Sequence, residues 1–163
     1  MTTEFRKAVL PDELRSLVTF DHKAFHEYPG DWFDRQTWMM YEPWWMIIDN
    51  RKAGCCAFER NVDFSEDKYG VNPTRPGSLY ISTTGILPEY QGRGLGKLLK
   101  VWQIAYAQHN GFTRIVTNHR ESNRRIIKLN QSFGFKIVRT TSKYYEAPPE
   151  PVVVMELKLR SAA

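Results

Sequence analysis

Residues 85–99 read GILPEYQGRGLGKLL, and three glycines alternate with other residues near the end of this stretch. Glycines at such spacing let the backbone come close to a bound group, often a phosphate. The stretch follows the apolar strand pattern LYISTTGIL, which stops at Pro88. From Leu95 to Tyr106, apolar residues then recur at helical spacing. The sequence therefore predicts a strand, a short turn and a helix whose first turn carries glycine.

Two familiar phosphate-binding loops are excluded by counting residues. A dinucleotide fingerprint G-x-G-x-x-G that starts at Gly92 needs a third glycine where Lys97 stands. A P-loop that ends on Gly96 and Lys97 needs glycine in place of Gln91, and serine or threonine in place of Leu98. Neither template fits this stretch.

A helix start of this kind still suits an anion. The first N–H groups of a helix lack intrahelical partners, and they carry partial positive charge. Arg93, Lys97 and Lys100 are expected to add charge nearby. The stretch therefore predicts a binding site for a pyrophosphate.

The rest of the chain predicts one α/β domain over residues 1–163, with a mostly antiparallel central sheet of six to seven strands and about four helices. A hairpin is expected at 44–60, with its turn near Asp49 and Asn50. The other expected elements are a strand at 3–10, a helix at 14–25, a polar loop at 61–78, a strand at 113–119, a helix at 121–135 and a closing antiparallel pair at 135–147 and 152–160.

Composition narrows the class of protein. The chain has 163 residues, 42% hydrophobic and 25% charged, which is typical of a soluble globular domain. A net charge of +5 suits a polyanionic ligand, but no run of five basic residues indicates a nucleic-acid surface. No apolar stretch is long enough to span a membrane, and the N-terminus is too charged for a secretory leader. Cys55 and Cys56 are adjacent, so we expect reduced thiols and a cytoplasmic protein.

On these residues the chain resembles the GNAT acyltransferases. Gln91, Gly94 and Gly96 match the Q/R-x-x-G-x-G/A core of that family's motif A, after a strand with a GILPE exit. ESNRRIIKLNQSFGF resembles the family's second motif, in which an Asn, here Asn123, opens a helix that ends in Gly-Phe, here 134–135. The order of elements agrees over essentially the whole chain.

The resemblance implies an N-acetyltransferase that uses acetyl-CoA, with no metal. It would transfer an acetyl group to a primary amine of a small molecule or peptide, by direct attack in a ternary complex. The family fold also implies a sheet splayed between the motif A strand and the next one. Neither a nucleic acid nor a membrane is an expected partner, and a homodimer is left open.

The resemblance also assigns the cofactor-binding residues. The pantetheine arm would lie along the strand exit at Ile86 and Leu87, one of which would donate its N–H to the oxyanion. Asn123 would contact the same arm or cap its helix. The pyrophosphate would lie on the backbone amides of the loop residues Gly92, Arg93, Gly94, Leu95, Gly96 and Lys97. Gln91, the first residue of the motif, is also assigned to the cofactor site.

Two family positions hold unusual residues here. Asn130 stands where many relatives have a tyrosine that acts as general acid, so it either hydrogen-bonds the thioester sulfur or plays a structural role. Tyr144, Tyr145 or water would then supply the proton. Ser82 stands where some relatives have a glutamate base, and serine is a poor base for an ammonium.

The general base must therefore come from elsewhere, and Glu59, Asp63, His26, Glu42 and a water chain are the alternatives. His22, His109 and His119 have no metal-ligand spacing, so we expect no metal.

The acceptor site is expected in the aromatic segment 25–45, where Asp31, Asp34 and Glu42 would suit an organic cation or an aromatic amine. The 61–78 loop is expected to close over it. Two other functions stay open: a non-catalytic acyl-CoA-binding or regulatory module, and, on charge alone, a nucleic-acid-binding protein.

Overall fold

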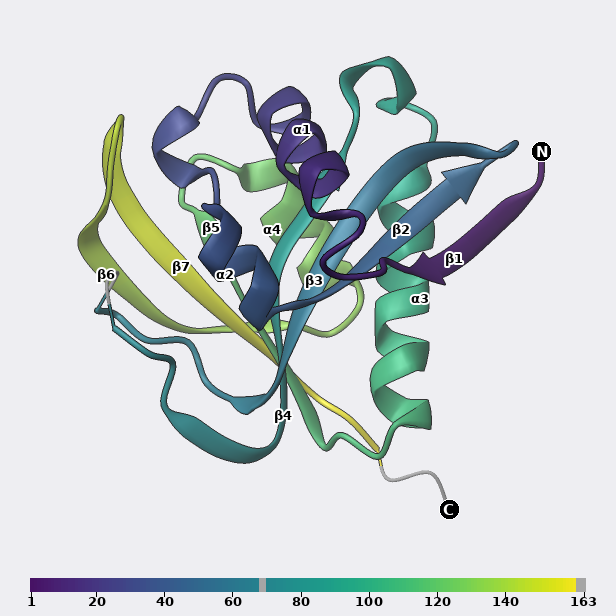
Figure 1. Cartoon of the computed structure of the whole chain (residues 1–163). Coiled ribbons are helices and arrows are strands. Elements are labelled where there is room, and N and C mark those ends of the chain that lie inside the picture. The colour runs from purple at the N-terminus through teal and green to yellow at the C-terminus, as the bar shows by residue number, and fades with distance from the viewer. Residues whose placement is uncertain (68–69, 161–163) are drawn as a thin grey trace. The chain divides into compact units, whose positions relative to one another are not determined.

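The computed structural model describes residues 1–67 and 70–160 (Figure 1). Its element order agrees with the order predicted from the sequence. The helices are α1 (Leu14–Ala24), α2 (Arg35–Met40), α3 (Leu95–His109) and α4 (Arg124–Ser132), with short 3-10 turns at Pro29–Asp31 and Pro88–Tyr90. The strands are β1 (Thr3–Lys7), β2 (Glu42–Ile48), β3 (Arg51–Val62), β4 (Thr74–Ile86), β5 (Arg114–Arg120), β6 (Lys136–Glu146) and β7 (Pro149–Lys158).

The strands form one seven-stranded sheet in the order β1-β2-β3-β4-β5-β7-β6. Four neighbouring pairs are antiparallel, namely β1/β2, β2/β3, β5/β7 and β6/β7. β4 and β5 pair in parallel, with Ser78 opposite Arg114 and Ile81 opposite Thr117. The predicted mixed fold with a mostly antiparallel sheet is therefore confirmed.

The chain divides into two compact units. Unit 1 comprises residues 1–59 and 82–99, and unit 2 comprises residues 60–81 and the chain from 100 onward. The prediction of a single domain over residues 1–163 stays a prediction.

Unit 1 is built on an aromatic core between helices α1 and α2 and the first strands. Leu17 and Phe20 of α1, Trp38 of α2 and Trp45 of β2 are all buried in it. The ring of Phe20 meets that of Trp45 edge to face at 5.6 Å, which is a favourable aromatic geometry. Half of the aromatic residues at 25–45, predicted to line an acceptor site, therefore also build this core, namely Phe33, Trp38, Tyr41 and Trp45.

The β2–β3 hairpin turns where the sequence predicted. Asp49 and Asn50 have φ values of 47° and 66°, the left-handed pair that a two-residue hairpin turn with the right twist requires. Asp and Asn tolerate this conformation better than other side chains do. Cys55 and Cys56 follow on β3, where both are buried, and neither belongs to a disulfide among the described residues.

Unit 2 contains β5, β6 and β7, and its core includes Phe64, Tyr80, Val116, Val152 and Val154. The predicted start of β4 was wrong: the strand begins at Thr74, whereas the sequence predicted a strand from Leu79. Pro76 and Gly77 argue against a strand by composition. In the structure the N–H of Gly77 donates to Oδ1 of Asn61 at 3.0 Å, so a side chain satisfies this backbone group.

Gly54 is tightly packed against the last residues of β4 in unit 1, and a substitution can test this packing. A Cβ at this position would lie 2.9 Å from Cδ1 of Ile86, 3.2 Å from Cβ of Met46 and 3.3 Å from the carbonyl oxygen of Gly85. Overpacking of this kind costs about 1–3 kcal/mol. We expect Gly54→Ala to lower the free energy of unfolding by that amount in urea denaturation. Gly96→Ala is the control, because a Cβ there meets nothing within 4 Å, and equal stability of the two variants would contradict the packing argument.

Candidate functional site

The exit of β4 is fixed by two hydrogen bonds within unit 1. The N–H of Leu87 donates to the carbonyl oxygen of Ala53 at 2.9 Å. The carbonyl oxygen of Ile86 accepts a hydrogen bond from Nε2 of Gln91 at 3.1 Å. Gln91 is exposed, so a ligand that pairs with the strand exit can displace its side chain at little cost. Of the two predicted oxyanion donors, Leu87 already uses its N–H, which leaves the N–H of Ile86 as the better candidate.

The glycine loop that follows has an unusual pattern of conformation and space. Gly92 and Gly94 have φ values of 77° and 76°, where glycine is strongly favoured. Gly96 lies in the first turn of α3 without a positive φ, and a Cβ there would meet nothing within 4 Å outside its own helix and neighbours. Neither backbone conformation nor packing requires glycine at position 96. A ligand that approaches the helix start closely would require it.

The charges near this loop differ from the prediction in one respect. Arg93 and Lys97 are exposed, and the Arg93 guanidinium lies 5.5 Å from the ring centroid of Tyr90. Lys100 was expected to add charge to the anion site, but its side chain is 1% exposed. Its ammonium lies 5.3 Å from the ring centroid of Phe135 within unit 2. Lys100 is therefore a core residue, since its position on α3 faces inward.

The two asparagines of the second motif have different environments in unit 2. Asn123 is exposed, and its side chain accepts a long hydrogen bond, 3.5 Å, from the N–H of Ile126 as the N-cap of α4. Asn130 is completely buried, as its place on the apolar face of the helix predicted. Nδ2 of Asn130 lies 3.1 Å from Nε2 of His119 and 3.6 Å from Sδ of Met155. Its Oδ1 has no hydrogen-bond partner among the described residues.

His119 is the polar centre of this buried group. Burial, together with the nearby ammonium of Lys100, lowers the pKa of His119 from its usual 6.5 to about 3. The imidazole is therefore neutral at physiological pH. Its Nε2 also lies 3.4 Å from Oγ1 of Thr117, so the ring joins β5 to Asn130 on α4.

A chain of hydrogen bonds in unit 2 was missed by the sequence reasoning. The hydroxyl of Tyr80 on β4 donates to Oδ1 of Asn118 on β5, and Nδ2 of Asn118 donates to the hydroxyl of Tyr145 on β6 at 3.1 Å. The guanidinium of Arg120 lies 4.3 Å from the ring centroid of Tyr145. The available signal was Asn118 itself, a polar residue that continues the apolar strand IVT.

The hydrogen bonds between Tyr80, Asn118 and Tyr145 distinguish the two tyrosines that were proposed as general acid. Tyr145 belongs to the hydrogen-bonded chain. Tyr144 is half-buried and packs edge to face on Phe64, with ring centroids 5.2 Å apart.

The other candidates for acid–base chemistry have their own local partners. Oγ of Ser82 donates to the carbonyl oxygen of Ala57 at 3.1 Å. Glu59 is half-buried at the end of the unit 1 part of β3. Glu42 pairs with Lys7 at 3.8 Å, and the exposed His26 lies 3.7 Å from Glu27.

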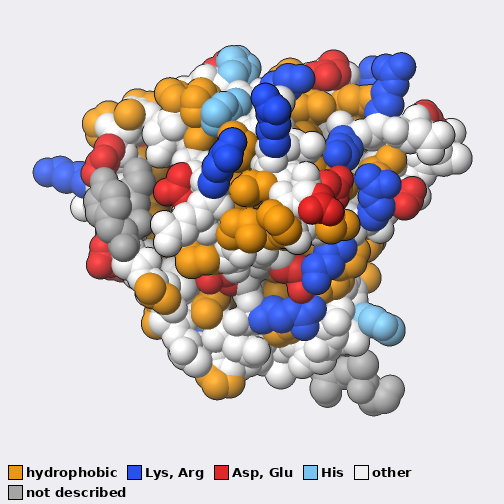
Figure 2. All heavy atoms as spheres, in the orientation of Figure 1, with side chains coloured by type: hydrophobic (Ala, Val, Ile, Leu, Met, Phe, Trp, Pro, Cys, Tyr) orange, Lys and Arg blue, Asp and Glu red, His pale blue; other side chains and the backbone are white. Residues whose placement is uncertain are grey.

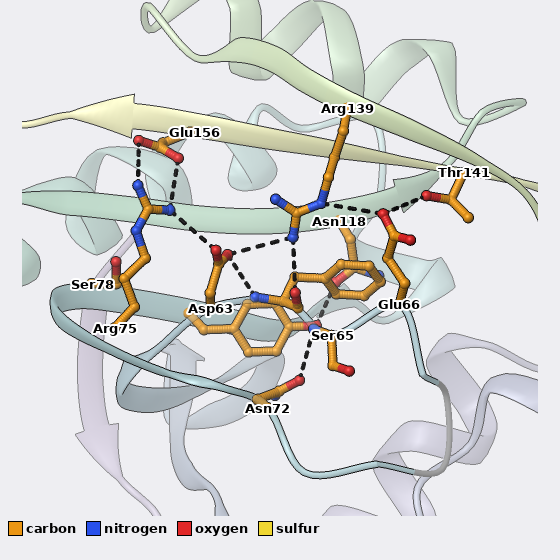
Figure 3. A network of polar contacts seen from close by, with 12 residues as sticks. Asp63, Ser65, Glu66, Asn72, Arg75, Ser78, Asn118, Arg139, Thr141 and Glu156 are labelled. Atoms are coloured by element: carbon orange, nitrogen blue, oxygen red, sulfur yellow. Dashed lines mark hydrogen bonds and ion pairs between the residues drawn. The ribbon is translucent and has the colours of Figure 1, made fainter.

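Asp63 is the best-paired of these carboxylates (Figure 3). Its oxygens lie 3.3 Å from Arg75 and 3.7 Å from Arg139. Arg75 also pairs with Glu156 at 3.0 Å. These ion pairs connect Asp63 to Arg75 of β4 and to Arg139 of β6, so we assign Asp63 to fixing its loop.

The contacts of Asp63 are part of a larger set that holds the 61–78 loop in place. Positions 68 and 69 of this loop lie outside the described residues. Arg139 donates to the carbonyl oxygen of Phe64 at 2.8 Å, and Thr141 donates to Glu66 at 2.8 Å (Figure 3). These bonds attach the loop to β6 within unit 2. Closure of this loop over an acceptor stays a prediction, and it would have to break these contacts.

No group of three or more His, Cys, Asp or Glu side chains with metal-binding geometry occurs in the part of the chain that the structure describes. Within the same residues, no helix is long and apolar enough to cross a membrane.

Comparison with known proteins identifies the family. The family model described as "Acetyltransferase (GNAT) family" matches residues 10–135. The chain belongs to the GNAT acetyltransferase family. The resemblance seen in the glycine loop and in the second motif is thereby confirmed.

Among relatives, a mycothiol acetyltransferase from Propionibacterium freudenreichii is 26% identical over 146 residues, which are 85% of this chain and 45% of that protein. This chain spans 36% to 59% of the length of the curated relatives that it matches.

Solved structures agree in fold. The ribosomal-protein-S18-alanine N-acetyltransferase from Escherichia coli has a TM-score of 0.78 and 18% identity, over 99% of this chain and 97% of that one. A Salmonella typhimurium structure with acetyl-CoA has a TM-score of 0.71 and 17% identity, over 100% of this chain and 97% of that one.

The lowered pKa of His119 generates a prediction about acid stability. Because the pKa of His119 is lower in the folded state, the unfolded chain binds the extra proton between pH 6.5 and about 3. His119 therefore costs stability progressively as the pH falls through that window. Relative to wild type, we expect His119→Gln to gain about 3 kcal/mol in free energy of unfolding between pH 6.5 and pH 4, at about 1.4 kcal/mol per pH unit.

Urea denaturation at several pH values measures this difference. His109→Gln, at an exposed histidine of α3, is the control and should follow wild type at every pH. A constant difference between His119→Gln and wild type would show that the native imidazole takes up the proton as easily as the unfolded one.

Proposed function

We propose that the chain transfers an acetyl group from acetyl-CoA to a primary amine of a small molecule or peptide, by direct attack in a ternary complex. The observation that carries this proposal is the open first turn of α3, where Gly96 is required neither by its conformation nor by its neighbours. Family membership and the GNAT fold support the same reaction.

The cofactor-binding residues are proposed as follows. The backbone of Gly92 to Lys97, with the exposed Arg93 and Lys97, would hold the pyrophosphate, because N–H groups and cations converge there. The strand exit at Ile86 would hold the pantetheine arm once the Gln91 side chain has moved from its carbonyl oxygen. Asn123 would act chiefly as the cap of α4. When bound, acetyl-CoA would supply an activated thioester.

The chain's own groups then have three tasks. The N–H of Ile86 would stabilise the oxyanion, since that of Leu87 is engaged. Tyr145 is the better-supported proton donor to the departing thiolate, because it ends a hydrogen-bonded chain and lies next to the cation of Arg120. The contacts of Asn130 with His119 support its structural role. A water chain is the proposed base, because Oγ of Ser82 donates to the carbonyl oxygen of Ala57 and the carboxylate of Asp63 is paired with two arginines. A role for Glu59 as base and one for Tyr144 as acid stay predictions.

The proposed partners follow from the same features. The names of similar proteins include a mycothiol acetyltransferase and a ribosomal-protein alanine acetyltransferase, so both small and peptide acceptors have precedent. On the face drawn in Figure 2, Lys and Arg side chains are interspersed with Asp and Glu side chains, which does not favour a nucleic acid. The buried free thiols support the cytoplasm as the proposed location.

One observation favours the second candidate, a non-catalytic acyl-CoA-binding module. Ser82 and Asn130, at the two family positions for base and acid, carry no titratable group. A screen of small amines and peptides, read by release of free CoA thiol, separates the two candidates. We expect at least one acceptor to release thiol above the rate of hydrolysis. CoA binding without acetylation of any acceptor would favour the module.

Gly96→Ala tests where the pyrophosphate lies. Alanine favours a helix over glycine by up to about 1 kcal/mol, so the variant should be as stable as wild type or more stable. Its methyl group would occupy space proposed for the ligand, and we expect the affinity for CoA in calorimetry to fall at least about tenfold, or roughly 1.4 kcal/mol. Gln108→Ala, exposed near the other end of α3, is the matched control. Unchanged affinity in Gly96→Ala would place the ligand elsewhere.

A further inference from the structure

Asp21 is a buried carboxylate without a cation. It lies on the core-facing side of α1, one turn after Leu17, and is only 3% exposed. Its Oδ2 accepts a hydrogen bond from the N–H of Phe33 at 2.9 Å. Among the described residues it forms no ion pair, and the charged group that acts on it is a second carboxylate, Asp31. Carboxylates buried to this extent are normally paired with a cation.

The pKa of Asp21 reflects the cost of burying its negative charge. Burial raises the pKa of Asp21 from 3.8 to about 6, against the opposing effect of the Phe33 hydrogen bond, and the negative charge of Asp31 raises it further. At neutral pH the carboxyl is still largely ionised. The fold thus retains a negative charge in unit 1 that no described side chain neutralises.

The residue whose backbone N–H binds this carboxylate is aromatic and belongs to a group of packed rings. Phe33, whose backbone binds Asp21, packs edge to face on Trp38 and Tyr41, with ring centroids 5.4 Å and 5.2 Å away. We call Phe33, Trp38 and Tyr41 the ring trio. Nε1 of Trp38 is buried and has no hydrogen-bond partner among the described residues. Phe33 and Tyr41 are half-buried, so the trio reaches the surface of unit 1. Aromatic faces attract ammonium groups, and a carboxylate in the same part of the unit adds the opposite charge.

The same part of unit 1 includes the strand exit. Phe25, one turn after Asp21, approaches Gly85 so closely that a Cβ there would lie 3.0 Å from its ring. Leu87 packs on the same core cluster as the ring trio. Asp21 therefore belongs to the layer that borders the proposed position of the thioester.

The acidic residues that the sequence suggested for this role are less suitable. Asp34 caps α2 by accepting the N–H of Thr37 at 2.7 Å, and Glu42 pairs with Lys7. Sequence reasoning assigned no role to Asp21, although an Asp among the apolar positions of the 14–25 helix was the available signal.

We propose that Asp21 and the ring trio bind the acceptor, and that they select a primary ammonium carried on an apolar or aromatic body. The proposal rests on the proposed function, because it assigns the acceptor side of that reaction. Asp21 would supply the charge, and the ring trio would supply the apolar contact and the cation–π attraction. The ammonium would replace the missing cation, so binding would relieve the cost of the buried charge.

Asp21→Asn tests this role with little change in shape. The amide oxygen can still accept the N–H of Phe33, and the buried charge is removed, so the melting temperature should stay the same or rise. The probes are phenethylamine, which is an ammonium at pH 8, and 2-phenylethanol, its neutral analogue. Wild type should bind phenethylamine at least about tenfold more tightly than 2-phenylethanol in calorimetry, and Asp21→Asn should lose that preference.

Asp34→Asn is the matched control, because it removes an exposed charge in the same segment and keeps a capping side chain. It should retain the preference for the ammonium. A retained preference in Asp21→Asn, or no preference or no binding in wild type, would overturn the proposal. The readout needs neither acetyl-CoA nor turnover, so it is independent of the acceptor screen. Ammonium binding with no acetylation of any acceptor would contradict only the proposed function.

Discussion

The left-handed conformation of two glycines fixes the part of this protein on which its proposed chemistry depends. Between the exit of β4 and the start of α3 the chain must turn so that the first N–H groups of the helix face outward, and Gly92 and Gly94 provide that turn at φ values near 76°. Leu95 and Leu99 then bury the opposite side of the helix. The polar end of α3 thus stays accessible because its apolar side is held in the core.

Buried polar groups give the two units different electrostatic character. In unit 2, Lys100 and Asn130 are buried, and desolvation together with the ammonium of Lys100 keeps the imidazole of His119 neutral. In unit 1, Asp21 keeps its charge without a cation beside it. Both arrangements cost stability, and such costs often accompany a functional site.

Much of the fold could be predicted because it depends on short-range rules. The β2–β3 turn follows from Asp49 and Asn50, which tolerate left-handed backbone, and Asn123 caps α4 as its position before the apolar pattern indicates. The glycine loop could be recognised because a positive φ favours glycine, so this backbone conformation can be inferred from the residue type.

Other features depend on tertiary contacts that no local pattern encodes. The burial of Lys100 depends on where α3 meets Phe135. The choice between Tyr144 and Tyr145 depends on a register shift between Thr141 and Tyr145, where Lys143 has a φ of 63°. Such an irregularity changes which side chains face the core, so alternation along the strand cannot decide between the tyrosines.

The two buried titratable groups also have opposite proton linkage. Between about pH 4 and pH 6, folding takes up a proton at Asp21, whose pKa rises, and releases one at His119, whose pKa falls. Over that range these two contributions largely cancel each other. Their effects on the free energy of unfolding are therefore large in each unit but opposite in sign. Neither effect would be visible in the pH dependence of the sum of the two.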